Sequence, residues 1–157
     1  MNPRILPLTE ESLSLAADVL RSGGLVVFPT DTVYGVGAAA SQLAAVDRIY
    51  AVKGRDQAKP LQVLLADPAD VLAVAGPLSP LALRAVEGLL PGGVTLVVKN
   101  GKKIAPQVVA GGETVGIRVP DLASVRALVR VLGEPLAATS ANRSGQPSPA
   151  TAEQAAE

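Results

Sequence analysis

Apolar residues recur at helical spacing in several stretches of this chain, and short apolar runs separate those stretches. Between Thr9 and Gly23 they fall every three or four positions, which predicts a helix capped by the threonine and ended by the glycine. The same signals predict helices over 41–54 and 121–132, and Asp121 is the expected cap of the second of these.

Two further helices and five strands complete the predicted elements. Asp67 and Ser79 each precede a proline, which places a capping side chain just before a first helical residue. The uninterrupted apolar run at 25–28 predicts a buried strand. The other expected strands are 61–66, 94–99, 114–119 and 136–138. Because strands and helices mix without strict alternation, we expect one α/β domain over residues 1–157, with a twisted, mixed sheet and flanking helices.

Composition limits the chemistry. The 157 residues include 14 basic and 14 acidic side chains and no histidine, cysteine or tryptophan. These absences exclude a Ser-His-Asp triad, a thiol nucleophile and the usual zinc sites, so catalysis must use carboxylates, lysine, arginine, hydroxyls and backbone groups. Zero net charge argues against bulk attraction to nucleic acid or membrane but allows a local basic cleft. No apolar run approaches the ~20 residues of a membrane helix, and residues 1–8 lack a signal-peptide pattern, so we expect a cytoplasmic protein.

Polar segments beside the expected strands carry the candidate chemistry. Residues 29–37 hold two threonines, an aspartate and two glycines, a pattern that fits either a ligand-binding loop or a hydrogen-bonded turn. Residues 53–60 hold the cations Lys53, Arg55 and Lys59, which can converge on one anion. The alternative for these cations is a favourable position at a helix C-terminus, the better interpretation for Lys53 alone.

Two more polar segments lie later in the chain. Strand alternation over 114–120 places Thr114, Gly116 and Arg118 on one face, so Arg118 is either an ion-pair anchor or a ligand clamp. Residues 139–148 supply hydroxyls, an amide and a glycine, which can line a nucleotide pocket or form an ordinary turn. The chain has neither a P-loop sequence nor a Gly-x-Gly-x-x-Gly after a strand, so a P-loop or Rossmann site is not predicted.

Taken in order, these four segments resemble the YrdC-like domain family, the threonylcarbamoyl-AMP synthases, over residues 25–149. The motifs that carry the resemblance are Pro29-Thr30-Asp31-Thr32-Val33-Tyr34-Gly35, Lys53-Gly54-Arg55 with Lys59-Pro60-Leu61, Val115-Gly116-Ile117-Arg118-Val119-Pro120, and Ser140-Ala141-Asn142 with Ser144-Gly145. The resemblance implies an open α/β sheet around a concave basic cavity, similar to dihydroxybutanone-phosphate synthase. Family members continue past the fourth segment, so it also implies a domain that is short at its C-terminus.

The resemblance implies an enzyme that makes threonylcarbamoyl-adenylate and pyrophosphate from ATP, L-threonine and bicarbonate, with Mg²⁺ accompanying ATP. The adenylate is the donor for modification of adenosine 37 in tRNAs that read ANN codons, so tRNA and the threonylcarbamoyl-transferase complex proteins are implied partners. Catalytic roles fall to Lys53 and Arg55. The implied threonine contacts are Thr32, Leu64, Arg118 and Ala138, and the implied ATP contacts are Arg55, Lys59, Thr114, Ser140, Asn142 and Ser148.

Two other functions fit the same residues. A YrdC-like RNA-binding protein would hold tRNA or double-stranded RNA in the basic concavity without forming an adenylate, but zero net charge and only three aromatic side chains weigh against it. A carbamoyl-transfer relative that handles carbamoyl-adenylate is also compatible with Lys53, Arg55, Ser140 and Asn142. Residues 142–157 lose apolar character, which predicts a loop with one helical turn or a frayed end.

Overall fold

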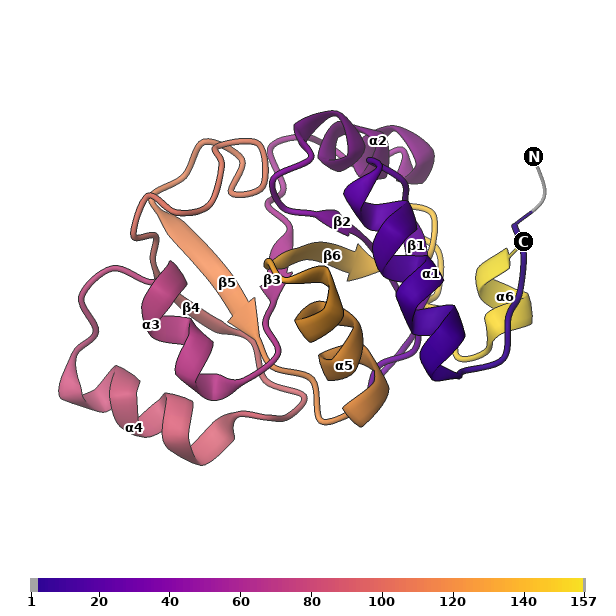
Figure 1. Cartoon of the computed structure of the whole chain (residues 1–157). Coiled ribbons are helices and arrows are strands. Elements are labelled where there is room, and N and C mark those ends of the chain that lie inside the picture. The colour runs from indigo at the N-terminus through magenta and orange to yellow at the C-terminus, as the bar shows by residue number, and fades with distance from the viewer. Residues whose placement is uncertain (1–2, 157) are drawn as a thin grey trace.

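The computed structural model describes residues 3–156 as one sheet with helices on both faces (Figure 1). The helices are α1 (Glu10–Arg21), α2 (Leu43–Lys53), α3 (Val71–Val74), α4 (Pro80–Leu89), α5 (Ala123–Leu132) and α6 (Ala152–Ala156), with a 3₁₀ turn η1 (Pro68–Asp70). The strands are β1 (Val26–Phe28), β2 (Gly35–Ala39), β3 (Gln62–Leu64), β4 (Leu96–Lys99), β5 (Thr114–Arg118) and β6 (Leu136–Ser140). Among these residues, no helix is both long enough and apolar enough to cross a membrane.

The six strands form one open sheet in the order β1-β2-β6-β3-β5-β4. The β3 and β5 strands run parallel, and every other neighbouring pair in this sheet is antiparallel. This mixed sheet confirms the fold class that the irregular order of strands and helices predicts.

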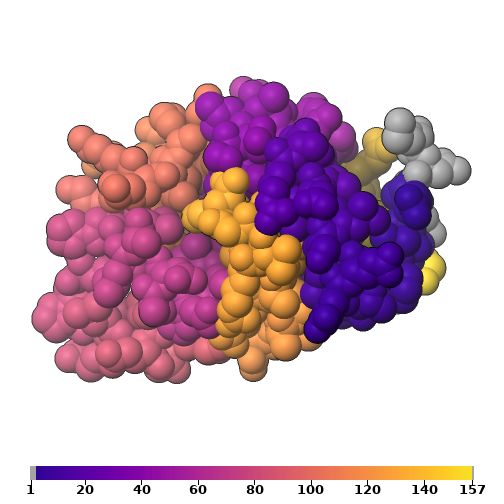
Figure 2. Space-filling view, in the orientation of Figure 1, coloured from indigo at the N-terminus to yellow at the C-terminus, as the bar shows by residue number. Residues whose placement is uncertain are grey.

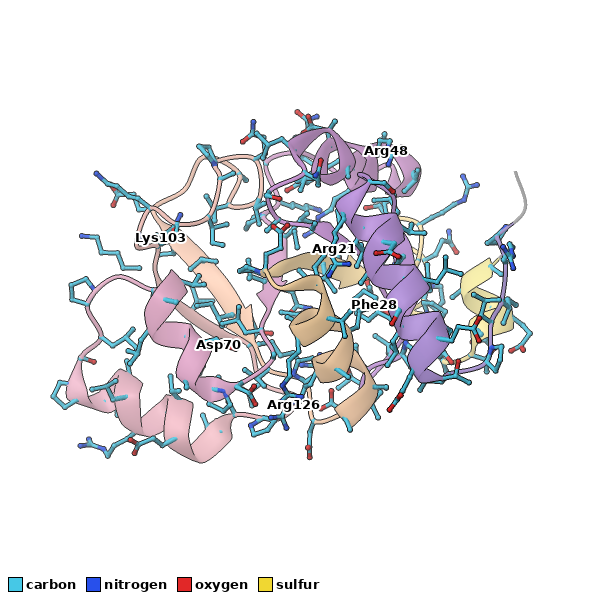
Figure 3. The ribbon with its side chains drawn as sticks, in the orientation of Figure 1. Arg21, Phe28, Arg48, Asp70, Lys103 and Arg126 are labelled. Carbon is cyan, nitrogen blue, oxygen red and sulfur yellow. The ribbon has the colours of Figure 1, made fainter. Side chains whose placement is uncertain are left out.

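Each face of the sheet buries its own set of apolar side chains. Cross-strand partners point to the same face, so the register assigns every strand residue to one face or the other. One face packs against α2, α3, α4 and the 104–109 segment through Val36, Ala38, Val63, Val115 and Ile117. The other packs against α1 and α5 through Phe28, Ala39, Leu64, Leu136 and Ala138. Helices α1 and α5 pack against each other (Figures 1 and 2), and Phe28 lies beside α1 (Figure 3).

Helices α1 and α5 cover only part of their face. The register of β3, β5 and β4 places a further set of residues on this same face: Gln62, Thr114, Gly116, Val97 and Lys99. These residues are half-buried or exposed, and Val97 is 70% exposed. We call this uncovered area, defined by these five residues, the open face.

Strand β2 is an element that the sequence does not predict. The sequence pattern extends a polar loop through residues 35–37, yet β2 is buried along its whole length. Its glycines permit this packing, because a Cβ at Gly37 would lie 3.0 Å from atoms of both Leu136 and Phe28. The expected site loop is therefore limited to residues 29–34.

Two predicted helix starts are wrong and two predicted caps are confirmed. Helix α2 begins at Leu43 rather than Ser41, because the N–H and hydroxyl of Ser41 bind the Glu134 carboxylate. Helix α5 begins two residues after Asp121, and its N-cap, Leu122, makes no side-chain bond. The hydroxyls of Thr9 and Ser79 cap α1 and α4, each accepting from a backbone N–H at 3.2 Å.

Other boundaries also differ. The run at 25–28 is not a buried strand: β1 is an edge strand that pairs with β2, and Val27 is 44% exposed. The helix expected after Asp67 is the short turn η1 followed by the single turn α3. The remaining expected strands are present with bounds shifted by a few residues. The last segment ends in the short helix α6, which corresponds to the first of its two expected alternatives, a loop with one helical turn.

Candidate functional site

The loop over residues 29–34 is a turn built by its own threonines. Thr30 Oγ1 donates to the Val33 carbonyl at 2.7 Å and accepts from the Thr32 N–H at 3.2 Å. The turn interpretation of this segment is therefore correct at the level of its backbone. The turn also leaves Thr32 exposed at the margin of the sheet, so the ligand-binding interpretation stays available.

Arg118, at the end of β5, connects this turn to the sheet. Its Nε donates to the Gly92 carbonyl at 3.0 Å, its Nη1 donates to Thr32 Oγ1 at 3.0 Å, and its Nη2 forms an ion pair with Asp31 at 2.5 Å. The structure thus brings together Thr32 and Arg118, the two polar residues implied as threonine contacts. Within this structure Arg118 is an ion-pair anchor, and its planar group already points at a carboxylate.

Lys53 is buried at the C-terminal end of α2. Its Nζ donates to the carbonyl oxygens of Ser140 and Asn142, and its own carbonyl accepts from the Ser144 N–H at 2.8 Å. Burial lowers the pKa of the Lys53 ammonium, and the nearby Arg55 charge lowers the pKa further. The lysine therefore joins the second polar segment to the fourth.

Arg55 organises the loop that carries Lys59. Its Nε donates to the Lys59 carbonyl at 3.2 Å, and its Nη2 donates to the Pro60 carbonyl at 2.9 Å. The Tyr50 hydroxyl also donates to the Lys59 carbonyl, at 3.2 Å, and burial raises the pKa of that hydroxyl. The backbone of this loop is thus fixed, while the Lys59 side chain is exposed.

The fourth segment lies against the first. The Ala141 N–H donates to the Tyr34 carbonyl and the Tyr34 N–H donates to the Pro149 carbonyl, both at 2.9 Å. Asn142 Nδ2 donates to the Gln146 carbonyl at 2.8 Å, which closes the turn, and the Ser140 hydroxyl bonds to Asn142 Oδ1. The predicted ATP contact Ser148 is exposed just before the buried Pro149.

The sheet register places the remaining predicted contacts on one face. Leu64 pairs with Arg118 on β5 and with Leu136 on β6, and Ala138 lies two residues further along β6. Leu64 and Ala138 are each 1% exposed beneath α1 and α5, so any contribution to a pocket comes from shape or backbone. Thr114, by contrast, is exposed on the open face.

Sequence reasoning left three candidates unassigned: Asp31, Gln62 and Thr95. Thr95 Oγ1 donates to Gln62 Oε1 at 2.9 Å on the open face. The available signal was strand alternation, because Gln62 is the one polar position in an otherwise apolar strand. Within residues 3–156, no three acidic side chains gather into a potential metal site, and Asp31 is committed to Arg118.

Comparison with known proteins places this chain. The Sua5/YciO/YrdC family model, described as "Telomere recombination", matches residues 18–157. Threonylcarbamoyl-AMP synthase of Bacillus subtilis is 42% identical over 152 residues, 96% of this chain and 44% of the relative. The Homo sapiens protein of that name is 43% identical over 138 residues, 88% of this chain and 49% of the relative.

Solved structures agree. The crystal structure of Pyrococcus abyssi Sua5 complexed with L-threonine matches with a TM-score of 0.91 and 36% identity, covering 98% of this chain and 44% of that one. The fold is thus that of an open α/β sheet with a polar, partly uncovered face. The chain belongs to the Sua5/YciO/YrdC family. It spans about half the length of the first curated relatives it matches.

Proposed function

We propose that this chain binds ATP and L-threonine at the open face and forms threonylcarbamoyl-adenylate. The observation that carries the proposal is the convergence of all four polar segments, in a chain 42% identical to a threonylcarbamoyl-AMP synthase. Arg118 joins the first and third segments, and Lys53 joins the second and fourth. The Ala141 N–H donates to the Tyr34 carbonyl, which joins the fourth segment to the first. These contacts support the inference that the four segments build one polar site.

The threonine end of the site is assigned to Arg118 and Thr32. A guanidinium whose Nε is fixed by a carbonyl presents its two Nη groups in one plane, the geometry that a carboxylate accepts. The Thr32 hydroxyl, 3.0 Å from Nη1, adds a second polar contact to the same ligand. Leu64 and Ala138, buried beneath α1 and α5, would contribute only through their backbone or through the shape of the sheet.

The triphosphate end is assigned to Arg55 and Lys59. Both lie on the loop after α2, and the fixed backbone of that loop reduces the entropy lost when a polyanion binds. Ser140, Asn142, Thr114 and Ser148 are proposed ATP contacts from the sheet margin and the fourth segment. Mg²⁺ enters with ATP as part of the substrate, coordinated chiefly by phosphate oxygens and water.

The reaction then needs positioning and charge stabilisation. The threonine amine attacks the carbon of bicarbonate-derived carbon dioxide, forming an N–C bond and releasing a proton to give a carbamate. A carbamate oxygen attacks the α-phosphorus, an O–P bond forms, the bond to the bridging oxygen breaks and pyrophosphate leaves. Cations on the phosphate oxygens stabilise the developing charge, which is the role proposed for Arg55, with Lys53 holding the adjoining segment.

The product of this reaction is a mixed anhydride of a carbamate and a phosphate, which makes it an activated donor. We propose that the threonylcarbamoyl-transferase complex proteins pass its threonylcarbamoyl group to adenosine 37 of tRNA, with AMP as the leaving group. We propose that the chain acts in the cytoplasm, where the tRNA that its product would modify is used.

Pyrophosphate release from ATP tests the proposal. We expect release that requires both L-threonine and bicarbonate and that serine supports poorly. Binding of ATP without threonine-stimulated release would contradict synthase activity in this chain. Salt-dependent tRNA binding without ATP turnover would favour the RNA-binding alternative.

A further inference from the structure

Gln62 and Thr95 form a polar bridge across the open face. Gln62 lies on β3 and Thr95 directly precedes β4, so the two flank Gly116 of β5. Their side chains meet above this glycine, where Thr95 Oγ1 donates to Gln62 Oε1 at 2.9 Å. A Cβ at Gly116 would lie 3.2 Å from Thr95 Cγ2 and 3.8 Å from Gln62 Cβ. A side chain at Gly116 would therefore press on Thr95, one of the two bridging residues.

The bridge fixes the orientation of the Gln62 amide. Its oxygen is occupied by the Thr95 hydroxyl, so its nitrogen faces away from that bond with two N–H donors. Gln62 Nε2 makes no hydrogen bond to any residue within 3–156, and the side chain is only half-buried. The open face therefore holds an oriented pair of donors that no protein acceptor uses.

The sheet register locates these donors between the two proposed substrate ends. Gln62 pairs with Ala138 of β6, which lies two residues before Ser140. It also pairs with Gly116 of β5, which lies two residues after Thr114. On its other side, two residues further along β3, lies the pair of Leu64 and Arg118. Two residues along a strand correspond to about 7 Å. Along the strands, Gln62 thus lies two residues from the level of the proposed ATP contacts Ser140 and Thr114, and two residues from the level of the proposed threonine contact Arg118.

We propose that Gln62 Nε2 binds the carbamoyl oxygen of threonylcarbamoyl-adenylate and of the carbamate that precedes it. This inference rests on the proposed function. The carbamoyl group is the part of the product that joins threonine to the α-phosphate, so it must lie between the two substrate ends. A carbonyl or carboxylate oxygen is a good acceptor for an amide N–H, and an amide donor has no acidic proton to lose during the reaction. Gln62 is a substrate-binding residue in this assignment.

Calorimetric binding of three ligands tests the inference without relying on turnover. The ligands are AMP, L-threonine and a hydrolysis-resistant analogue of threonylcarbamoyl-adenylate with a sulfamate in place of the phosphate. Gln62→Met removes the donors at nearly constant size. Gln62→Glu keeps the acceptor for Thr95, and so preserves the bridge, but cannot donate. Thr95→Val keeps the donors and removes only the group that orients them.

We expect Gln62→Met to weaken the analogue about tenfold, the value of one hydrogen bond, while binding of AMP and of L-threonine changes less than about twofold. Gln62→Glu should weaken the analogue at least as much, although its bridge is intact, and Thr95→Val should weaken it less. Equal analogue affinity in wild type and Gln62→Met overturns the inference and leaves the proposed function standing. A wild-type chain that binds none of the three ligands overturns both.

Discussion

Arg118 Nη2 and Asp31 Oδ1 lie 2.5 Å apart although 87 residues separate them in the sequence. The side chains are 8% and 18% exposed, so water screens this ion pair far less than it would a surface pair. The pair holds the 29–34 turn against the end of β5. It also means that the proposed clamp for a substrate carboxylate already holds a carboxylate of the protein.

Replacing Arg118 should therefore affect both stability and threonine binding. Arg118→Ala leaves Asp31 and the Gly92 carbonyl without a partner, and we expect a loss of about 3 kcal/mol in the free energy of unfolding. Arg118→Lys keeps the charge but not the planar fork, so it should recover part of the stability and little of the threonine affinity. Urea unfolding and calorimetry measure the two effects. The exposed Arg84 on α4 supplies the control Arg84→Ala. Threonine affinity equal to wild type in Arg118→Lys would remove the clamp assignment.

Lys53 supports a second prediction. Its ammonium donates to two carbonyl oxygens of the 140–142 turn, so Lys53→Met should free that turn and cost about 2–3 kcal/mol. In Lys53→Met, hydrogen exchange at the Ser144 N–H, which donates to the Lys53 carbonyl, should be faster than in wild type. Exchange at the amides of α1 should not change. Lys102→Met, at an exposed site, is the matched control. Unchanged exchange at Ser144 would show that the lysine does not hold the turn.

The sequence predicts the fold class and most elements because capping and burial leave local signals. Thr9 and Ser79 cap helices through bonds to residues three positions away, a distance within reach of any local pattern. Ser41 fails as a helix start because its partner, Glu134, lies 93 residues away. Strand β2 is missed because glycine and alanine have little preference for β-strands. The reason for a glycine at position 37 becomes clear only from the close packing of Phe28 and Leu136.

The candidate site also has parts that the sequence predicts and parts that only the structure shows. The motifs group residues that the structure also brings together: the 29–34 turn contacts Arg118, and Lys53 contacts the 140–142 turn. They do not indicate that Lys53 and Arg55 bind carbonyl oxygens of the protein, because a cation near an anion site and a cation that fixes a loop look alike in sequence. Strand alternation marks Gln62 as the one polar position of its strand, but only the register shows that it lies between two sets of predicted contacts.

Two glycines should respond oppositely to alanine. Gly37→Ala places a Cβ 3.0 Å from Leu136 Cγ and from Phe28 Cε1, and we expect a loss of about 1–3 kcal/mol from overpacking. Gly88, in α4, has nothing within 4 Å of its Cβ position, so Gly88→Ala should stabilise by about 0.5–1 kcal/mol through helix propensity. Urea unfolding of the pair tests this contrast. A neutral Gly37→Ala would mean that Phe28 moves freely beneath α1.

Asp67 should make stability depend on acid. Its carboxylate accepts hydrogen bonds from Arg130 at 2.7 and 3.0 Å and from Arg126 at 2.5 Å, and Figure 3 shows Arg126 on α5. The bonds from Arg130, and then those from Arg126, lower the pKa of the Asp67 carboxyl below its ordinary value of 3.8. A carboxyl with a lowered pKa in the folded state contributes its full stabilisation above the unfolded value, and this is lost as the pH falls through the folded value.

Asp67→Asn should therefore lower the Tm at pH 7, and the Tm difference from wild type should shrink as the pH falls below about 3.8, because protonation removes the same charge from the wild type. Thermal unfolding by circular dichroism from pH 7 to pH 2.5 measures this convergence. Asp18→Asn removes an exposed carboxylate that pairs with Arg21 on α1, so its Tm difference should stay small throughout. If the Tm difference between Asp67→Asn and wild type stayed constant across the pH range, the two arginines could not be stabilising the charged form of Asp67. The contacts of Arg126 and Arg130 with Asp67, just before η1, would then contribute through packing alone.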